Sequence, residues 1–255
     1  MLDKDLLEYL NAKANEYEER NFIENDPIVI PHQFNLKEDI EIAGFLTAMI
    51  AWGNRKSIIK SAQNMMQIMG DSPYEFVINF SRENITILPN SLHRTFLKDD
   101  FICVVECLQN SYLNLGGLEK LMSNCIINNG MEKGLSDFKK LFFANHPSKR
   151  SFKHLPDPLS GSAAKRMVMF LRWMCRQSNK NVDLGIWKSI SPKLLHIPLD
   201  VHTGNIARKL QIISRKQNDW KTVEELQKIA IQVFPNDPSK LDFALFGIGV
   251  YKVLD

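Results

Sequence analysis

The segment from Asn35 to Ile50 is apolar on nearly every side of the helix that its spacing predicts. Asn35, with Glu38 three residues later, has the pattern of a capping box and marks the expected helix start. A helix that is apolar all round must be covered on every side by other parts of the protein. The segment therefore predicts a central helix around which other helices pack.

Amphipathic helical patterns recur along most of the remaining chain. Residues 81–98 are an exception, because they are polar and irregular and contain one short strand-like run, Ile85 to Leu88. Roughly ten to twelve helices and almost no strands predict an all-α fold. The expected helices cover residues 2–20, 55–69, 99–114, 117–129, 134–143 and 161–176, with others beginning near Ser72, Asp200, Thr222 and Asp237, the last of which runs to the C-terminus.

The composition fits a globular protein without a membrane span. The chain has 255 residues, of which 44% are apolar and 24% charged, as is usual for soluble domains. This length suits one large domain or two smaller lobes. No run approaches the ~18 apolar residues of a membrane helix. The first eight residues are acidic and amphipathic, unlike a signal peptide, so we expect a cytoplasmic location and no membrane partner.

The cysteines show no spacing that is typical of a metal site or a disulfide framework. Cys103 and Cys107 lie four residues apart in an apolar helical run, which suits small buried side chains. We therefore expect no disulfide, no metal and no iron–sulfur cluster. The remaining two cysteines are Cys125 and Cys175.

Basic residues are concentrated between residues 149 and 176, although the net charge of the chain is only +3. A basic block of this kind suits a polyanionic partner, and the alternative is a solvated basic face. One acid, Asp157, interrupts the block. Its basic members are Lys149, Arg150, Lys153, Lys165, Arg166, Arg172 and Arg176.

The stretch from His196 to Leu210 combines an extended approach, one acid and a helix. Pro198 disfavours helical geometry in the residue before it. Asp200 can then cap the following helix by accepting from backbone N–H groups. His202 lies two residues beyond this acid, on the polar and basic side of the helix. Asp200 is therefore either a simple cap or a poised catalytic acid.

The expected helix over residues 161–176 places Lys165 in its first turn. At ~100° per residue, Lys165, Arg172 and Arg176 fall within about 40° of one another, opposite the apolar stripe. The positive end of the helix dipole disfavours an ammonium there and so favours a neutral amine. Only a neutral amine is a nucleophile. The alternative is a solvated lysine that aids solubility.

Four segments of the chain together resemble the helix-hairpin-helix DNA glycosylase superfamily. Lys165 and the Pro198-Leu199-Asp200-Val201-His202 stretch resemble the lysine and aspartate motifs of that superfamily. Leu155-Pro156 with Gly161-Ser162-Ala163-Ala164-Lys165 is similar to its hairpin. The other two matches are residues 42–62, with Trp52 where glutamine is usual, and residues 243–249.

The match is nearest to the 8-oxoguanine and archaeal 8-oxoguanine glycosylase branches, and to a bacterial family within the superfamily. The chain departs from the pattern in three places. Asp200 follows Lys165 by 35 residues, which is longer than usual. Ala163 replaces the second hairpin glycine, and an insertion follows Pro156. The absence of a four-cysteine loop after Asp200 fits the 8-oxoguanine branches.

The resemblance implies a base-excision glycosylase and abasic lyase that acts on a damaged base, an oxidised purine, in double-stranded DNA. Lys165 would be the nucleophile and Asp200 the catalytic acid. Trp52 would line the base pocket, although a core tryptophan at a helix corner is the alternative. The expected DNA contacts are Gly161, Ser162, Arg166, Arg172 and His202, the last of which is otherwise a surface or half-buried histidine.

The resemblance also implies two helical lobes that flank a central cleft. One lobe would combine residues 1–39 with 198–255, and the other would be a bundle over 40–197 that contains the hairpin-like element 155–176. We expect a monomer without a cofactor. Two alternatives stay open: a non-catalytic nucleic-acid-binding protein that retains the fold, and a helical scaffold protein.

Overall fold

The computed structural model describes residues 3–84, 88–144, 146–147 and 149–250. The chain divides into two compact units. The terminal unit combines residues 1–23 with 157–255, and the central unit comprises residues 24–156. These boundaries differ from the expected ones, because residues 157–197 belong with the two termini and residues 24–39 belong with the central helices.

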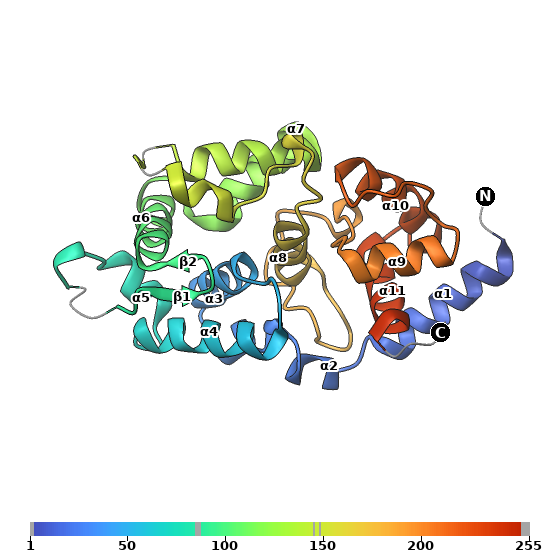
Figure 1. The fold of residues 1–255 in the computed structure, drawn as a ribbon, viewed down its shortest axis with the longest axis horizontal. Coiled ribbons are helices and arrows are strands. Elements are labelled where there is room, and N and C mark those ends of the chain that lie inside the picture. Colours follow the sequence, from blue (N-terminus) through green and yellow to red (C-terminus); the bar gives the residue numbers. More distant parts are fainter. Residues whose placement is uncertain (1–2, 85–87, 145, 148, 251–255) are drawn as a thin grey trace. The chain divides into compact units, whose positions relative to one another are not determined.

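The central unit is built around helix α3 (Lys37–Met49), as its apolar pattern predicts (Figure 1). Every residue from Ile40 to Ile50 is buried. The buried carboxylate of Glu41 accepts a hydrogen bond of 2.6 Å from the Tyr112 hydroxyl. The expected capping box is wrong, because the helix begins at Lys37 and its N-cap is Leu36, which makes no side-chain cap bond.

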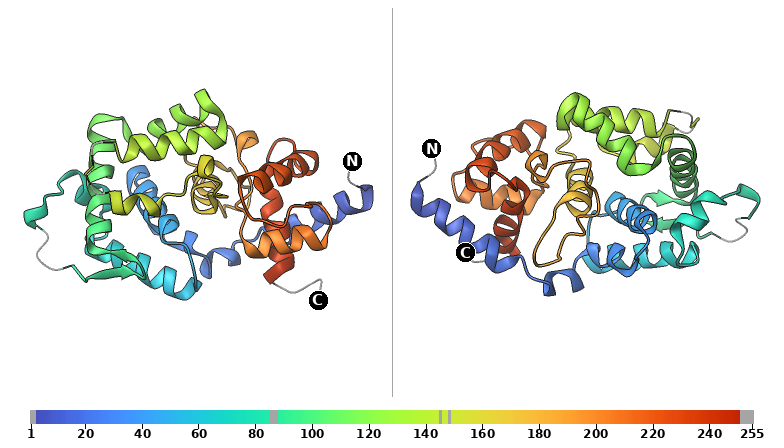
Figure 2. Two further views of the ribbon diagram at one scale, coloured as in Figure 1. Left: turned by 45° about the horizontal axis from the view of Figure 1, so that its top comes forward. Right: turned by 180° about the vertical axis from the view of Figure 1, so that it is seen from behind.

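The other helices of the central unit surround α3. They are α4 (Arg55–Ile68), α5 (Pro73–Ile78), α6 (Lys98–Asn114) and α7 (Gly117–Phe142), with short 3-10 turns at Pro27–Val29, Pro31–Gln33, Arg82–Asn84 and Lys149–His154. The short α2 (Asn21–Glu24) lies at the boundary between the units. Helices α6 and α7 pack together, and both are drawn in green in Figure 2. Helix α7 replaces two expected helices and bends at Gly130, whose φ of 73° suits glycine.

One small antiparallel hairpin interrupts the helical pattern of the central unit. Strand β1 (Ser91–His93) pairs with β2 (Phe96–Leu97). The strand-like run expected at residues 85–88 falls largely outside the described residues, which omit 85–87. The described chain is thus mostly helical, as predicted, and no helix in it is long and apolar enough to cross a membrane.

The terminal unit contains five α-helices among its described residues. They are α1 (Lys4–Tyr17), α8 (Lys165–Cys175), α9 (Val201–Lys209), α10 (Trp220–Val233) and α11 (Leu241–Val250), with 3-10 turns at Pro158–Ser160, Pro192–Leu194 and Pro238–Lys240. Helix α11 packs against both α1 and α9, although α1 lies at the other end of the chain (Figures 1 and 2). This packing joins helices from the two ends of the chain in one unit.

Buried ion pairs explain why α8 belongs to the terminal unit. Arg172 donates to Asp183 at 3.2 Å and also pairs with Asp242 on α11. One turn later, Arg176 pairs with Asp183 at 2.9 Å and with Glu18, just after α1, at 2.7 Å. Charges removed from water must be paired, so these contacts fasten α8 to the terminal helices. The helix wheel could not predict these acids, because they lie outside the segment 161–176.

Candidate functional site

The terminal unit brings the two predicted catalytic residues together. Lys165 is the first residue of α8 and Asp200 is the N-cap of α9. The Lys165 Nζ atom lies 3.3 Å from Asp200 Oδ2. The two side chains are 33% and 22% exposed, so solvent and a substrate can reach the pair.

Asp200 uses its two carboxylate oxygens for different contacts. The Thr203 backbone N–H donates to Oδ1 at 2.9 Å, which is a helix-cap bond. The other oxygen, Oδ2, faces Lys165. Asp200 itself is extended, with φ −119° and ψ −171°, which is the usual backbone conformation of an N-cap residue. The cap and the lysine contact therefore coexist in one side chain.

Asp200 is ionised at neutral pH. Burial raises the pKa of this carboxyl, but attraction to Lys165, the Thr203 N–H and nearby His202 together outweigh that effect. The resulting pKa of Asp200 lies below its usual value. An ionised carboxylate of this kind stabilises a neighbouring cation.

The backbone reverses sharply just before Lys165. Gly161 has φ 86° and Ala164 has φ 47°, so two left-handed residues occur within four positions. An alanine in this region is uncommon and strained. The Ser162 hydroxyl accepts a 3.2 Å hydrogen bond from the Ala164 N–H and so supports the turn. This local geometry directs the start of α8, and with it Lys165, toward Asp200.

The predicted DNA contacts have different environments. Gly161 and His202 are exposed, and Ser162 is half-buried. Arg166 is also half-buried, and burial lowers the pKa of its guanidinium to about 10, which leaves it charged at neutral pH. These four residues lie within two positions of the lysine or aspartate, or in the turn that precedes the lysine.

Arg172 is not available for the phosphate contact that was expected. Its side chain is 4% exposed and is occupied by Asp183 and Asp242. The prediction is wrong because the face of α8 opposite the apolar stripe is covered by acidic residues of the same unit, and not by water. Arg176 is buried in the same way.

Asp242 is a residue near the site that the sequence interpretation missed. Burial raises the pKa of its carboxyl to about 6, although Arg172 opposes this shift. The charges of Asp200 and Lys165 also act on Asp242, which places it near the pair. A signal was present, because Asp242 is an acid within the apolar run Leu241 to Leu245 and such an acid needs a buried partner.

Comparison with known protein families gives one result. A family model described as a protein of unknown function, DUF2400, matches residues 26–251. The chain belongs to the DUF2400 family. Comparisons of this DUF2400 chain with curated proteins and with solved structures give no match.

Trp52 of this DUF2400 chain lies in the central unit, after α3. The half-buried indole stacks on the His154 ring at 6.0 Å between centroids and meets His93 edge-on at 5.3 Å. His154 lies 3.2 Å from the buried carboxylate of Asp100. Trp52 is therefore part of an aromatic and histidine cluster, and its role in a base pocket stays a prediction.

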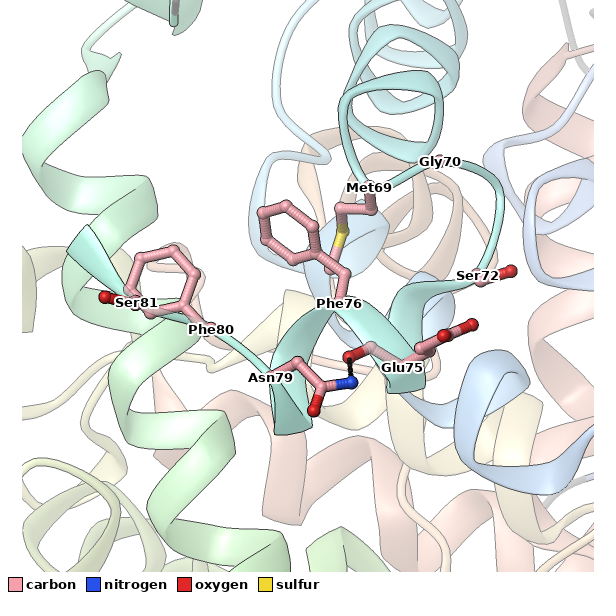
Figure 3. Close-up of a pocket in the computed structure, with 8 residues that line it drawn as sticks. All are labelled: Met69, Gly70, Ser72, Glu75, Phe76, Asn79, Phe80 and Ser81. Carbon is pink, nitrogen blue, oxygen red and sulfur yellow. Dashed lines mark hydrogen bonds between the residues drawn. The ribbon is translucent and has the colours of Figure 1, made fainter. Parts of the chain in front are cut away.

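A pocket of about 350 Å³ lies in the central unit and contains none of the predicted site residues (Figure 3). Phe76, Phe80 and Met69 form its apolar wall, and Glu75 stands at its edge. The residues that line this pocket thus differ from the Lys165–Asp200 pair both in their place in the sequence and in their chemistry. In the residues that the structure describes, no group of three or more His, Cys, Asp or Glu side chains is placed to hold a metal ion.

Proposed function

We propose that this protein is a DNA glycosylase with abasic-site lyase activity, which acts on an oxidised purine in duplex DNA. The contact of 3.3 Å between the Lys165 amine and the Asp200 carboxylate supports this proposal most directly. The proposal includes the helix-hairpin-helix glycosylase fold that the motifs around these residues resemble. It also includes a flipped base, because the reacting sugar carbon cannot be reached within duplex DNA.

The pair suits nucleophilic catalysis at the sugar. The Lys165 ammonium must first lose a proton, and the adjacent Asp200 carboxylate can relay that proton toward the departing base, which leaves the free amine. The amine attacks C1′, and the bond from C1′ to the damaged base breaks with its electron pair leaving on the base. The base then takes up the proton. Asp200 stabilises the positive charge that develops on the sugar.

A lyase step can follow from the same covalent link. Opening of the sugar ring gives an imine between Lys165 and C1′. Loss of a proton from C2′ then expels the 3′ phosphate, and water finally releases the lysine. The N-termini of α8 and α9 carry the positive ends of two helix dipoles. These helix ends, together with Arg166 and His202, suit the phosphates that flank the sugar.

Borohydride trapping tests the proposal. The protein is incubated with duplex oligonucleotides that contain 8-oxoguanine or an abasic site, and reduction should yield a covalent complex. Lys165→Ala should abolish that complex while salt-dependent DNA binding survives. Lys228→Ala is the matched control, because Lys228 is an exposed lysine of the same unit and lies 28 residues after Asp200.

Two results would contradict the proposal in different ways. Binding to DNA without trapping on a broad set of lesions would favour a non-catalytic nucleic-acid-binding protein. Absence of binding to any nucleic acid at low salt would favour a helical scaffold.

A further inference from the structure

The side chain of Asn218 makes hydrogen bonds at both ends of helix α9. Its Nδ2 donates to the backbone carbonyl of Asp200 at 3.1 Å. Its Oδ1 accepts from Arg208 Nη2 at 2.7 Å. Arg208 also donates to the carbonyl of Arg215 at 2.7 Å, which shapes the loop between α9 and α10. Asn218 therefore connects this loop to the residue that faces Lys165.

The next residue, Asp219, contacts the segment that precedes Lys165. Asp219 and Ser162 form an isolated antiparallel β-bridge. Asp219 is itself fixed, because it caps α10 through Thr222 and pairs with Arg215 at 2.6 Å. Two consecutive residues thus contact the backbone at or near both members of the Lys165–Asp200 pair: Asn218 contacts Asp200, and Asp219 contacts the segment before Lys165.

The space around Asn218 leaves little freedom for its amide. A Cβ atom added at Gly204, in the first turn of α9, would lie 2.7 Å from Asn218 Oδ1 and 2.8 Å from Arg208 Nη1. Contacts this short require a side chain to move. The glycine at this position allows the amide to reach the carbonyl of Asp200.

We propose that Asn218 is a positioning residue that sets the geometry of the Lys165–Asp200 pair, which rests on the function proposed above. The amide fixes the backbone of Asp200 relative to the loop, while Asp219 fixes the turn ahead of Lys165. Asn218 touches neither reacting side chain, so its effect is on their relative position. A displacement of about 1 Å in such a site can lower a rate by about 100-fold.

The test compares Asn218→Ala and Asn218→Asp with the wild-type protein. Both variants lose the donor to the Asp200 carbonyl, and the aspartate variant keeps the acceptor for Arg208. We expect the single-turnover rate of trapping to fall roughly 10- to 100-fold, with DNA affinity changed by less than about 2-fold. Gln217→Ala is the control, because Gln217 is the exposed neighbour of Asn218 in the same loop.

A second measurement needs no DNA and reports on position directly. Carboxyl NMR titration of Asp200 should show its pKa rising toward the usual value in both variants, because contact with Lys165 is loosened. The new charge in Asn218→Asp also raises the pKa of Asp200, whereas Asn218→Ala adds no charge and so gives the positional part alone. The titration thus separates a change of geometry from a change of charge.

Gly204→Ala covers the case in which the Asn218 variants do not fold. This variant keeps the asparagine but displaces its amide, and it should give the same loss of rate and the same change in titration. Wild-type rates and wild-type Asp200 titration in folded variants would overturn the positioning role. If wild-type protein traps no DNA but the titration still shifts in the variants, the positioning role stands and the glycosylase proposal fails.

Discussion

Helix α8 carries two kinds of ion pair on the side that faces away from its apolar stripe. Lys165, at the start of the helix, meets Asp200 in a contact that is partly open to solvent. Arg172, seven residues later, meets Asp183 and Asp242 where the side chains are at most 9% exposed. The open pair is accessible to solvent, whereas the buried pair holds the helix in place. Position along one helix therefore separates the pair that the proposed function uses from a structural pair.

The largest expected effect is on the buried pair. Arg172→Ala leaves the carboxylates of Asp183 and Asp242 without their shared cation, and breaking a buried pair from one side costs about 3–5 kcal/mol. Urea denaturation measures this loss of unfolding free energy. A loss below about 1 kcal/mol would mean that the two pairs on α8 do not differ in kind.

A smaller effect concerns the pH dependence of stability. The pKa of Asp242 is about 6 in the folded protein and that of Asp200 lies below its usual value. A raised folded-state pKa means that the folded state binds an extra proton, so Asp242 lowers stability as pH rises from about 4 to about 6. We expect Asp242→Asn to remove this decline, which is on the order of 3 kcal/mol, in denaturation curves recorded at a series of pH values.

Asp200 behaves in the opposite sense. Its contribution to stability is present above the usual carboxyl pKa and is lost as pH falls through its lower folded-state pKa. An unchanged pH profile in Asp242→Asn would contradict the assignment of the decline to the buried carboxyl.

The next effect separates the two contacts of Asp200. Asp200→Ala loses the cap of α9 and should cost about 1 kcal/mol of unfolding free energy. Asp200→Asn keeps a good capping residue and should retain stability within about 0.5 kcal/mol, but it removes the charge opposite Lys165. Thermal melts and borohydride trapping should therefore both show a loss for the alanine variant. For the asparagine variant, trapping should fall while the melting temperature is retained.

A small change in stability is also expected for Lys165→Ala. A partly exposed ion pair contributes about 1 kcal/mol or less, so the unfolding free energy should hardly change while trapping disappears. Lys165→Ala would then lose trapping and keep its stability, whereas Arg172→Ala would lose stability, although both residues belong to one helix. A large loss of stability in Lys165→Ala would place the open pair in the structural class with Arg172.

Sequence patterns predicted the helices well because their cause is local. The burial of α3 follows from its own residues, and the cap at Asp200 follows from an acid placed directly before a helical pattern. The pairing of Lys165 with Asp200 is not local, and it was predicted only through the resemblance to known motifs. Arg172 shows the limit of a helix wheel, which gives the direction of a side chain but not what lies there.

The missed residues differ in how visible they were. Asp242 could have been found, since an acid within an apolar helix implies a buried partner. Asn218 gave no such signal, because an asparagine between polar loop residues is ordinary turn composition. The unit boundaries depend on contacts such as that of Arg176 with Glu18, which lie far apart in the chain.

The left-handed alanine before Lys165 has a consequence for motion. Glycine would adopt φ 47° without strain, whereas this conformation costs an alanine about 1–2 kcal/mol of free energy. An alanine also has fewer alternative backbone conformations than a glycine. Ala164 thus works as a stiff joint rather than a hinge. Excursions of the amine at the start of α8 must come from rotation about the four side-chain bonds of Lys165, on a timescale of picoseconds to nanoseconds, and not from slower swings of its backbone.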